Sequence, residues 1–249
     1  MGPRGKRWRS RLRVAAALLL VVIAIDAIWL RWQWPDWDKV ARGPVPASRF
    51  MRDWERTSGK RAKWRPVALG TLPPSLPRAV TIAEDSRFWG HAGFDVEALR
   101  EAWSENVSRG RVAFGGSTIS QQTAKNLFLT PSRTPIRKWH EVVLTWGLER
   151  NVTKKRILEI YLNDAELGSG LFGVEAAAQT YYAIPASALS DEQAVELAAT
   201  LPSPRKHNPE TRTRAWQRRV TKIQKHVARY AATPAPSATP AQTTGTGAP

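Results

Sequence analysis

The chain has 249 residues and a formal net charge of +17, because 38 Lys and Arg outnumber 21 Asp and Glu. It contains no cysteine, which excludes disulfide bonds, thiolate metal sites and a cysteine nucleophile. The length allows one sizeable domain with extensions. The positive charge indicates an anionic partner, and by charge alone this is nucleic acid, lipid headgroups or a phosphorylated substrate.

The N-terminus combines a basic segment with an apolar one. Residues 1–13 hold six Lys and Arg and no acid, and the apolar run at 14–31 contains one acid, Asp26. At about 1.5 Å per residue the run is near the short end for a membrane span, and the tryptophans at its far end can anchor it at the interface. We predict a transmembrane anchor with a cytoplasmic N-terminus, Asp26 at the interface and the rest of the chain outside the cytoplasm.

A cleaved signal peptide is the alternative interpretation of this run. No clean small-x-small cleavage site follows it, and the run is long for a signal core, so we favour the uncleaved anchor. Residues 32–75 contain six prolines and are predicted to be a juxtamembrane connector, with a short helix at 49–54.

The globular body is expected over 76–230 and is predicted to be mainly α-helical. Its apolar residues recur at helical spacing, and runs of alternating β-branched residues are absent. The predicted helices span 76–88, 95–107, 117–129, 135–150, 154–163, 172–182, 191–200 and 209–230. Helix-start signals support this pattern at Thr134-Pro135, Thr153 and Ser190-x-x-Gln193.

The stretch GGSTISQQTAKNLFL at 115–129 is the centre of this body. Ser117 or Thr118 can cap a helix. Gln121 and Lys125 then share one face of that helix, and Gln122 and Asn126 share the next, because residues four apart are neighbours. Amides suggest directed hydrogen bonding, and a helix start favours anions. The alternative is the solvated face of an ordinary helix.

Two further clusters carry carboxylates. Glu84 and Asp85 precede aromatic residues, whose surroundings raise a carboxyl pKa by desolvation and suit an acid or base; the alternative is a charged helix end. Arg137 and Lys138 precede Glu141 by four and three residues and can share its helical face, unless they form an ordinary surface ion pair.

Four ordered patterns connect the clusters: Glu-Asp-x-x-Phe-x-x-His-x-Gly-x-Asp, Gly-Gly-Ser-Thr-Ile-x-Gln-Gln-x-x-Lys-Asn, Arg-Lys-x-x-Glu and Ile-Leu-Glu-x-Tyr-Leu-Asn. Over roughly 76–205 the chain thereby resembles the peptidoglycan glycosyltransferases, lipid II polymerases found alone or fused to a transpeptidase. The resemblance implies a lysozyme-like helical domain. About 45 residues follow Pro204, and 231–249 are uncharged and rich in Pro, Thr, Ala and Gly. We therefore expect a disordered tail, no transpeptidase domain and the monofunctional type.

The resemblance also implies a reaction. A glycan on undecaprenyl pyrophosphate is transferred to the 4-hydroxyl of lipid II, with inversion to a β-1,4 linkage and release of undecaprenyl pyrophosphate. Glu84 matches the family's proposed base. Glu141 matches its second catalytic glutamate, which could orient cations, hold a metal or assist the leaving group. The matching substrate-binding positions are Asp85, Ser117, Gln121, Gln122, Lys125, Asn126, Arg133, Arg137 and Lys138.

Several partners follow from the same resemblance. A divalent cation, Mg²⁺ or Mn²⁺, is a candidate cofactor at the pyrophosphate, with Glu84, Asp85 and Glu141 as candidate ligands. The anchor and the basic body fit a lipid pyrophosphate at the bacterial inner membrane, with the catalytic domain in the periplasm. Nucleic acid explains the charge but not the anchor and is not expected. Other cell-wall synthases or division proteins are further candidate partners.

One position departs from the family pattern. The residue before Glu141 is commonly Lys in the family and is His140 here, which weakens one phosphate contact near neutral pH. Two other functions stay open at this point. A lysozyme-type hydrolase would use one catalytic glutamate and would not need Lys125 or Arg133, and a catalytically silent scaffold of the cell-wall machinery would need neither.

Overall fold

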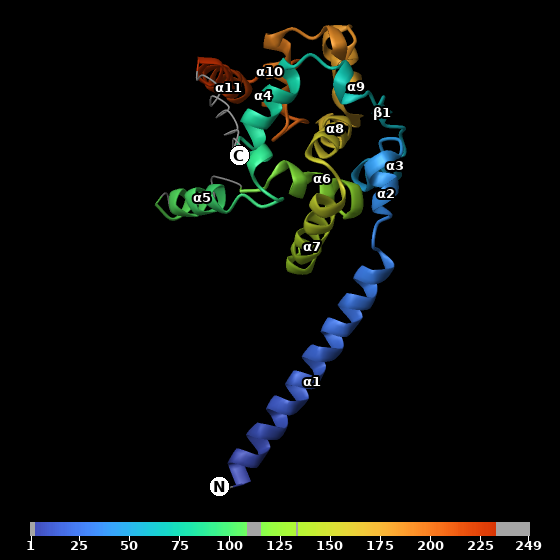
Figure 1. The fold of residues 1–249 in the computed structure, drawn as a ribbon, viewed down its shortest axis with the longest axis vertical. Helices are drawn as coiled ribbons and strands as arrows, with labels where there is room; N and C mark the ends of the chain where they lie inside the picture. The colour runs from blue at the N-terminus through green and yellow to red at the C-terminus, as the bar shows by residue number, and fades with distance from the viewer. Residues whose placement is uncertain (1–2, 109–115, 133, 233–249) are drawn as a thin grey trace, which may run out of the picture.

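The computed structural model describes residues 3–108, 116–132 and 134–232, and helices dominate these residues (Figure 1). The helices are α1 (Pro3–Trp32), α2 (Trp37–Arg42), α3 (Arg49–Ser58), α4 (Ser75–Glu84), α5 (Val96–Ser108), α6 (Ile119–Phe128), α7 (Pro135–Asn151), α8 (Lys154–Asp164), α9 (Val174–Tyr182), α10 (Asp191–Thr200) and α11 (Arg214–Ala232). Short 3₁₀ turns lie at Leu69–Thr71, Phe88–Gly90 and Ala186–Ala188. The prediction of a mainly helical fold is confirmed.

Most of helix α1 extends away from the other helices (Figure 1), while Asp26 and Trp29 near its C-terminal end contact α7. Its segment Leu12–Trp32 is long and apolar enough to cross a membrane, and it is the one such helix among the described residues. It contains the predicted anchor at 14–31. The apolar side chains of this segment are largely exposed in the isolated chain, which is the pattern of a helix whose partner is lipid or another protein.

The core of the body surrounds α8. Its side chains Ile157, Leu158, Ile160 and Leu162 are almost completely buried, and a helix that is apolar on several faces must be covered on all of them. Helix α6 packs between α7 and α8, while α4 packs against α10 and α11. Two groups of helices therefore meet where α4 ends and α6 begins.

Three short strands form one small sheet that the helical pattern did not predict. Strand β3 (Leu171–Phe172) lies between β1 (Lys63–Trp64), which runs parallel to it, and β2 (Glu166–Gly168), which runs antiparallel. Two or three residues are too few to display an alternating pattern. Gly170 permits the turn before β3, because its φ is +68° and an added Cβ would lie 2.2 Å from the ring of Trp54.

The segment expected to be a connector, 32–75, packs as part of the body. Asn163 holds it to α8, because its side-chain oxygen accepts from the Val67 N–H and its amide donates to the Val67 carbonyl, both at 2.8 Å. Asn163 therefore has a structural role, joining this segment to α8. The core therefore begins well before residue 76, with the buried side chains Trp37, Val40, Met51 and Leu72.

Helix α11 begins later than the predicted 209–230, at Arg214. The side chain of Asn208 accepts hydrogen bonds from the backbone N–H groups of Glu210 and Thr211, at 3.1 and 2.9 Å. Asn side chains stabilise turns in this way and compete with the helix. The chain therefore turns before the helix starts.

Candidate active site

The N-terminus of α6 is closed by a capping box. The Thr118 hydroxyl accepts from the Gln121 N–H at 3.1 Å, and the Gln121 side-chain oxygen accepts from the Thr118 N–H at 3.0 Å. Thr118, and not Ser117, is thus the cap. Gln121 is buried in this arrangement, so its position does not support the predicted substrate contact. Ser117 is exposed and remains a candidate.

Asp85 also serves the start of α6. Its carboxylate accepts the Ile119 N–H at 2.9 Å and lies 3.0 Å from His91 Nε2. An anion at a helix start is favoured by the free N–H groups there. Because the Asp85 side chain is buried and engaged inside the protein, its predicted substrate or metal contact is not supported. Helix α4 ends at Glu84, directly before Asp85. The helix predicted at 76–88 is therefore four residues shorter at its C-terminal end.

Glu84, the last residue of α4, is largely buried, with 12% of its side chain exposed. One carboxylate oxygen pairs with the Arg219 guanidinium at 2.6 Å, and the other accepts from the Gln122 amide at 3.1 Å. Burial raises the pKa of Glu84, while Arg219, Gln122 and Lys125 act in the opposite direction. A carboxylate whose pKa is raised holds a proton better, which suits a general base.

The Gln122 amide is fixed between two side chains. Its nitrogen donates to Glu84, and its oxygen accepts from the hydroxyl of Tyr161 at 3.2 Å. Tyr161 is fully buried in α8, and burial raises its pKa well above the ordinary value, so its hydroxyl keeps its proton and acts as a donor. Gln122 is thereby a link between the base candidate and the core.

Lys125 lies one turn further along α6 and is half-buried. Its ammonium lies 5.5 Å from the centre of the Phe50 ring. Burial lowers the pKa of Lys125, and the charge of Glu141 opposes this effect. Because its charge also acts on Glu84, Lys125 connects the two predicted catalytic glutamates electrostatically.

A hollow of about 160 Å³ beside Lys125 and Asn126 ends on Asp164. Asp164 is fully buried and burial raises its pKa to about 7. Ser48 and Asn126 favour its charged form from nearby, but neither of its oxygens makes an ordinary hydrogen bond to a described residue. Asn126 therefore lines the hollow as predicted, next to a carboxyl that the sequence motifs did not include.

Glu141 is held by cations from its own helix. Arg137 donates to one carboxylate oxygen at 2.7 Å, and Lys138 to the other at 2.5 Å. The predicted shared face of the three residues is confirmed, and Glu141 is buried. Arg133, the remaining predicted cation, lies outside the described residues.

The described side chains do not form a metal site by themselves. No group of three or more His, Cys, Asp or Glu within the described ranges could hold an ion. The three candidate ligands are each engaged: Glu84 with Arg219, Asp85 with His91, and Glu141 with two cations. These residues do not fit a metal held by the protein alone.

Helix α1 contacts α7 one residue before Glu141. The Asp26 carboxylate lies 2.6 Å from His140 Nε2 and accepts from the Trp139 indole at 3.1 Å. The Trp29 ring stacks on His140 with 4.3 Å between centroids. Asp26, predicted simply to lie at the interface, thus joins the anchor to the helix that carries Glu141.

Sequence reasoning missed three side chains of the site. Tyr161 lies within the Ile-Leu-Glu-x-Tyr-Leu-Asn pattern and Asp164 directly follows it, so the sequence pointed to this part of the site without showing the role of either residue. Arg219 comes from α11 and reaches Glu84 across 135 positions of sequence, which no local pattern can show. Glu84 lies beside Gln122 and within the electrostatic influence of Lys125, and Lys125 in turn is influenced by Arg137, Lys138 and Glu141 and lines a hollow with Asn126. Gln121 and Asp85 lie in the helix cap.

A buried carboxylate beside several lysine and arginine side chains can accept a proton and stabilise an anionic leaving group. A model of the transglycosylase family matches residues 52–228. The biosynthetic peptidoglycan transglycosylase of Laribacter hongkongensis is 40% identical over 226 residues, which cover 89% of this chain and 96% of that protein. That of Methylobacillus flagellatus is 42% identical over 232 residues, covering 91% and 97%.

The chain therefore belongs to the peptidoglycan transglycosylase family, whose activity is the polymerisation of glycan strands in cell wall synthesis. A third relative, from Nitrosospira multiformis, has the same name and is 41% identical over 225 residues, covering 88% of this chain and 94% of that protein. The family predicted from the ordered motifs is confirmed.

Proposed function

We propose that the chain polymerises lipid II into β-1,4 glycan strands with inversion and releases undecaprenyl pyrophosphate. The observation that carries this proposal is the environment of Glu84. This carboxylate is buried, its pKa is raised by that burial, and Gln122 joins it to the helix that carries Lys125. Base and cations are thus placed together, as transfer from a diphosphate requires.

In the proposed step Glu84 accepts the proton of the acceptor's 4-hydroxyl. The oxygen attacks the anomeric carbon of the donor from the face opposite the diphosphate, so the configuration inverts. The bond between that carbon and the diphosphate oxygen breaks, and the diphosphate leaves with the electron pair. The proton remains on Glu84 until it passes to solvent. No covalent enzyme intermediate is needed.

The leaving diphosphate requires neutralisation more than protonation. Lys125, Arg137 and Lys138 supply positive charge, and Glu141 holds the last two in place through its ion pairs. Fixed charges act strongly in a site that excludes water. Arg133 is proposed as a further phosphate contact. A divalent cation, Mg²⁺ or Mn²⁺, would be bound chiefly by the diphosphate, because the carboxylates here are engaged.

The apolar segment of α1 supports membrane attachment. Six Lys and Arg precede it and favour a cytoplasmic N-terminus, with the body on the periplasmic side of the inner membrane. This orientation brings the site to the membrane that holds a lipid-linked substrate. Other cell-wall synthases and division proteins are proposed as partners.

The test is a polymerisation assay with purified full-length protein in detergent or vesicles, supplied with lipid II with and without a chelator. We expect long glycan strands that lysozyme digests. A control incubated without lysozyme should leave the strands intact. Loss of product with chelator would assign a required divalent cation. Cleavage of finished peptidoglycan without polymerisation of lipid II would contradict the proposal and favour a hydrolase.

A further inference from the structure

The contact between the anchor and α7 joins two residues that are unusual in the sequence. Asp26 is the one acid in the apolar run at 14–31, and His140 stands where the family pattern commonly has Lys. Asp26 Oδ1 lies 2.6 Å from His140 Nε2, and the other Asp26 oxygen accepts from the Trp139 indole. Both oxygens of the carboxylate are therefore engaged by α7, through a pair that the family motifs do not contain.

A carboxylate solvated at the membrane interface is the simpler interpretation of Asp26. The Asp26 side chain is only 18% exposed, however, and that of His140 only 10%. An ionisable residue in an apolar membrane helix is costly unless it is paired, and its partner indicates its role. Trp29, one turn further along α1, stacks on His140. The anchor thus holds this ring by a hydrogen bond and by an aromatic contact.

The anchor contact continues a packed face of α7. His140 and Gly147 are seven positions apart, which is two helical turns, so they lie on the same face. An added Cβ at Gly147 would lie 2.6 Å from the Trp37 ring and 3.0 Å from the Trp34 ring, so these rings pack directly on the backbone. Trp29 covers the same face two turns earlier, in the N-terminal half of α7.

The N-terminal half of α7 also carries the cations of the site. Arg137 and Lys138 pair there with Glu141, which directly follows His140. Most residues at 134–139 are exposed, whereas His140 is buried. The anchor contact is therefore a support for the turn that places these charges.

We propose that Asp26 is a positioning residue of the transfer reaction. Through His140 it fixes the turn of α7 that carries Arg137, Lys138 and Glu141, so the anchor takes part in building the site and is more than a tether. This role rests on the proposed function, because the charges that it positions are those assigned to the leaving diphosphate. A support that acts on the leaving group in the transition state changes kcat and leaves KM nearly constant.

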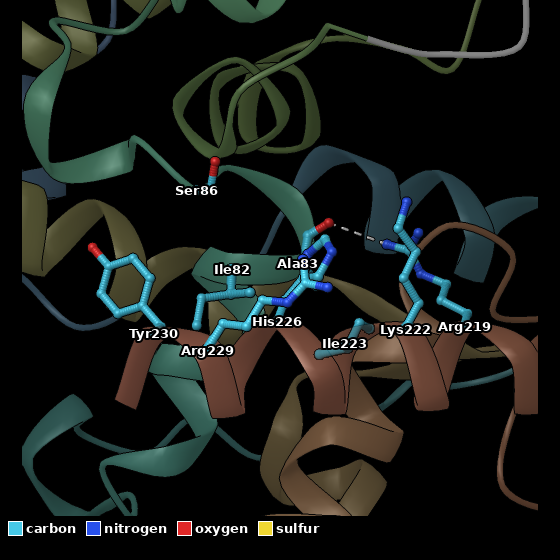
Figure 2. A pocket seen from close by; sticks show the side chains of 9 residues that line it. All are labelled: Ile82, Ala83, Ser86, Arg219, Lys222, Ile223, His226, Arg229 and Tyr230. Atoms are coloured by element: carbon cyan, nitrogen blue, oxygen red, sulfur yellow. Dashed lines mark hydrogen bonds between the residues drawn. The ribbon is translucent and has the colours of Figure 1, made fainter. Parts of the chain in front are cut away.

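The candidate base is held by other elements. Figure 2 shows Arg219 reaching from α11 to the end of α4, where it donates to the Ala83 carbonyl at 3.3 Å. The same nitrogen pairs with Glu84, and the second partner of Glu84, Gln122, comes from α6. Loss of the Asp26 contact should therefore lower the rate without moving the acidic limb of the rate profile, along which Glu84 becomes protonated.

The first test detects the contact without turnover. The chain has no cysteine, so Asp26→Cys/His140→Cys places its only two thiols at the contact. In full-length protein in lipid nanodiscs, a short bifunctional thiol reagent should link them within one chain, as seen by peptide mass spectrometry. Ile28→Cys/His140→Cys is the matched control, because Ile28 is exposed and lies about 200° round α1 from Asp26. Equal linking of both pairs would overturn the contact.

The second test replaces Asp26 by Leu, which leaves an anchor without an acid. A simple tether should insert at least as well after this change. We expect Asp26→Leu instead to lower kcat for lipid II polymerisation about tenfold, with KM within about twofold and the acidic limb in place. Ile28→Leu should resemble the wild type. An unchanged kcat, or a raised KM alone, would overturn the positioning role.

A double-mutant cycle assigns the loss to the pair. His140→Phe keeps an aromatic ring for Trp29 and removes the hydrogen bond to Asp26. Because replacing both partners by apolar groups leaves neither one unpaired, Asp26→Leu/His140→Phe should lose about tenfold in kcat, where independent effects would multiply to about a hundredfold. Multiplied losses would overturn the pair. A linked chain that does not polymerise lipid II would overturn the proposed function, and the positioning role with it, while the contact itself stands.

Discussion

The two glutamates of the site are both buried but have different surroundings. Glu84 shares its oxygens between one arginine, which comes from a distant helix, and one amide. Glu141 has a cation on each oxygen, and both cations come from its own helix. Burial is the largest influence on Glu84 and raises its pKa.

This difference separates a proton acceptor from an organiser of charge. A carboxylate with incomplete compensation gains by accepting a proton, because the neutral form is easier to bury. A carboxylate between two cations stabilises them, and removing it would leave positive charge unbalanced. We therefore assign the base role to Glu84 and the positioning of Arg137 and Lys138 to Glu141.

The largest expected effect is that of Glu84→Gln. The change keeps the shape and removes the base, so polymerisation of lipid II should fall about 1,000-fold or more. Thermal stability should be kept, since an amide avoids the cost of a buried charge. Product gels and thermal unfolding of the same preparation check both points. Wild-type polymerisation by a folded variant would refute the base assignment.

Lys125→Ala should reduce kcat/KM for lipid II about 100-fold, the size expected when one charge-stabilising group is removed. Stability should change little, because burial already disfavours the charge of Lys125. Lys206→Ala, an exposed lysine outside the site, is the matched control. If the two variants have the same kcat/KM, Lys125 is not part of the catalytic machinery.

Arg219→Ala tests the partner that distinguishes Glu84 from Glu141. The arginine lowers the pKa of Glu84, so its removal should raise that pKa further. The base works only when deprotonated, and the acidic limb of the rate profile should therefore move to higher pH, with activity partly recovered in alkaline buffer. The neighbouring exposed Arg218→Ala should leave the limb in place. A uniform loss at every pH would instead indicate a contact unrelated to proton transfer.

Asp164 is a buried carboxyl with no ordinary hydrogen bond to a described residue, and the effect expected for it is smaller. Its folded pKa of about 7 lies above the ordinary 3.8, so the folded state binds the proton more tightly. The resulting stability is complete below about pH 3.8 and is lost as the pH rises through about 7, by at most about 4 kcal/mol. Asp164→Asn should be less pH-dependent over this range in denaturant unfolding. If Asp164→Asn has the same pH dependence of unfolding as the wild type, other titrating groups cause that dependence.

Local patterns predicted the Glu141 side of the site better than the Glu84 side. Arg137, Lys138 and Glu141 lie within one helical turn, so sequence spacing alone determines that they share a face. The Glu84 environment depends on Arg219 and Tyr161, which the packing of α11 and α8 brings there. Such contacts between distant segments leave no spacing signal.

The cap of α6 could have been predicted more fully from the sequence. Thr118-Ile-Ser-Gln121 is itself a capping-box pattern, which predicts the hydrogen bonds that Gln121 makes at the start of the helix. The mainly helical class was predictable because apolar spacing repeats along each helix. The small sheet and the packing of 32–75 were not, because strands of two or three residues and proline-rich segments are positioned by the core they join.

The pH dependence of kcat/KM for lipid II, compared between the wild type and Glu141→Gln, tests the division of roles most directly. We expect the acidic limb of the wild type above the ordinary glutamate pKa of 4.5. Glu141→Gln should lower the rate across the profile and keep that limb, because Glu84 still accepts the proton. A variant that loses the acidic limb while Glu84 is intact would show that Glu141 is the titrating base and would contradict this account.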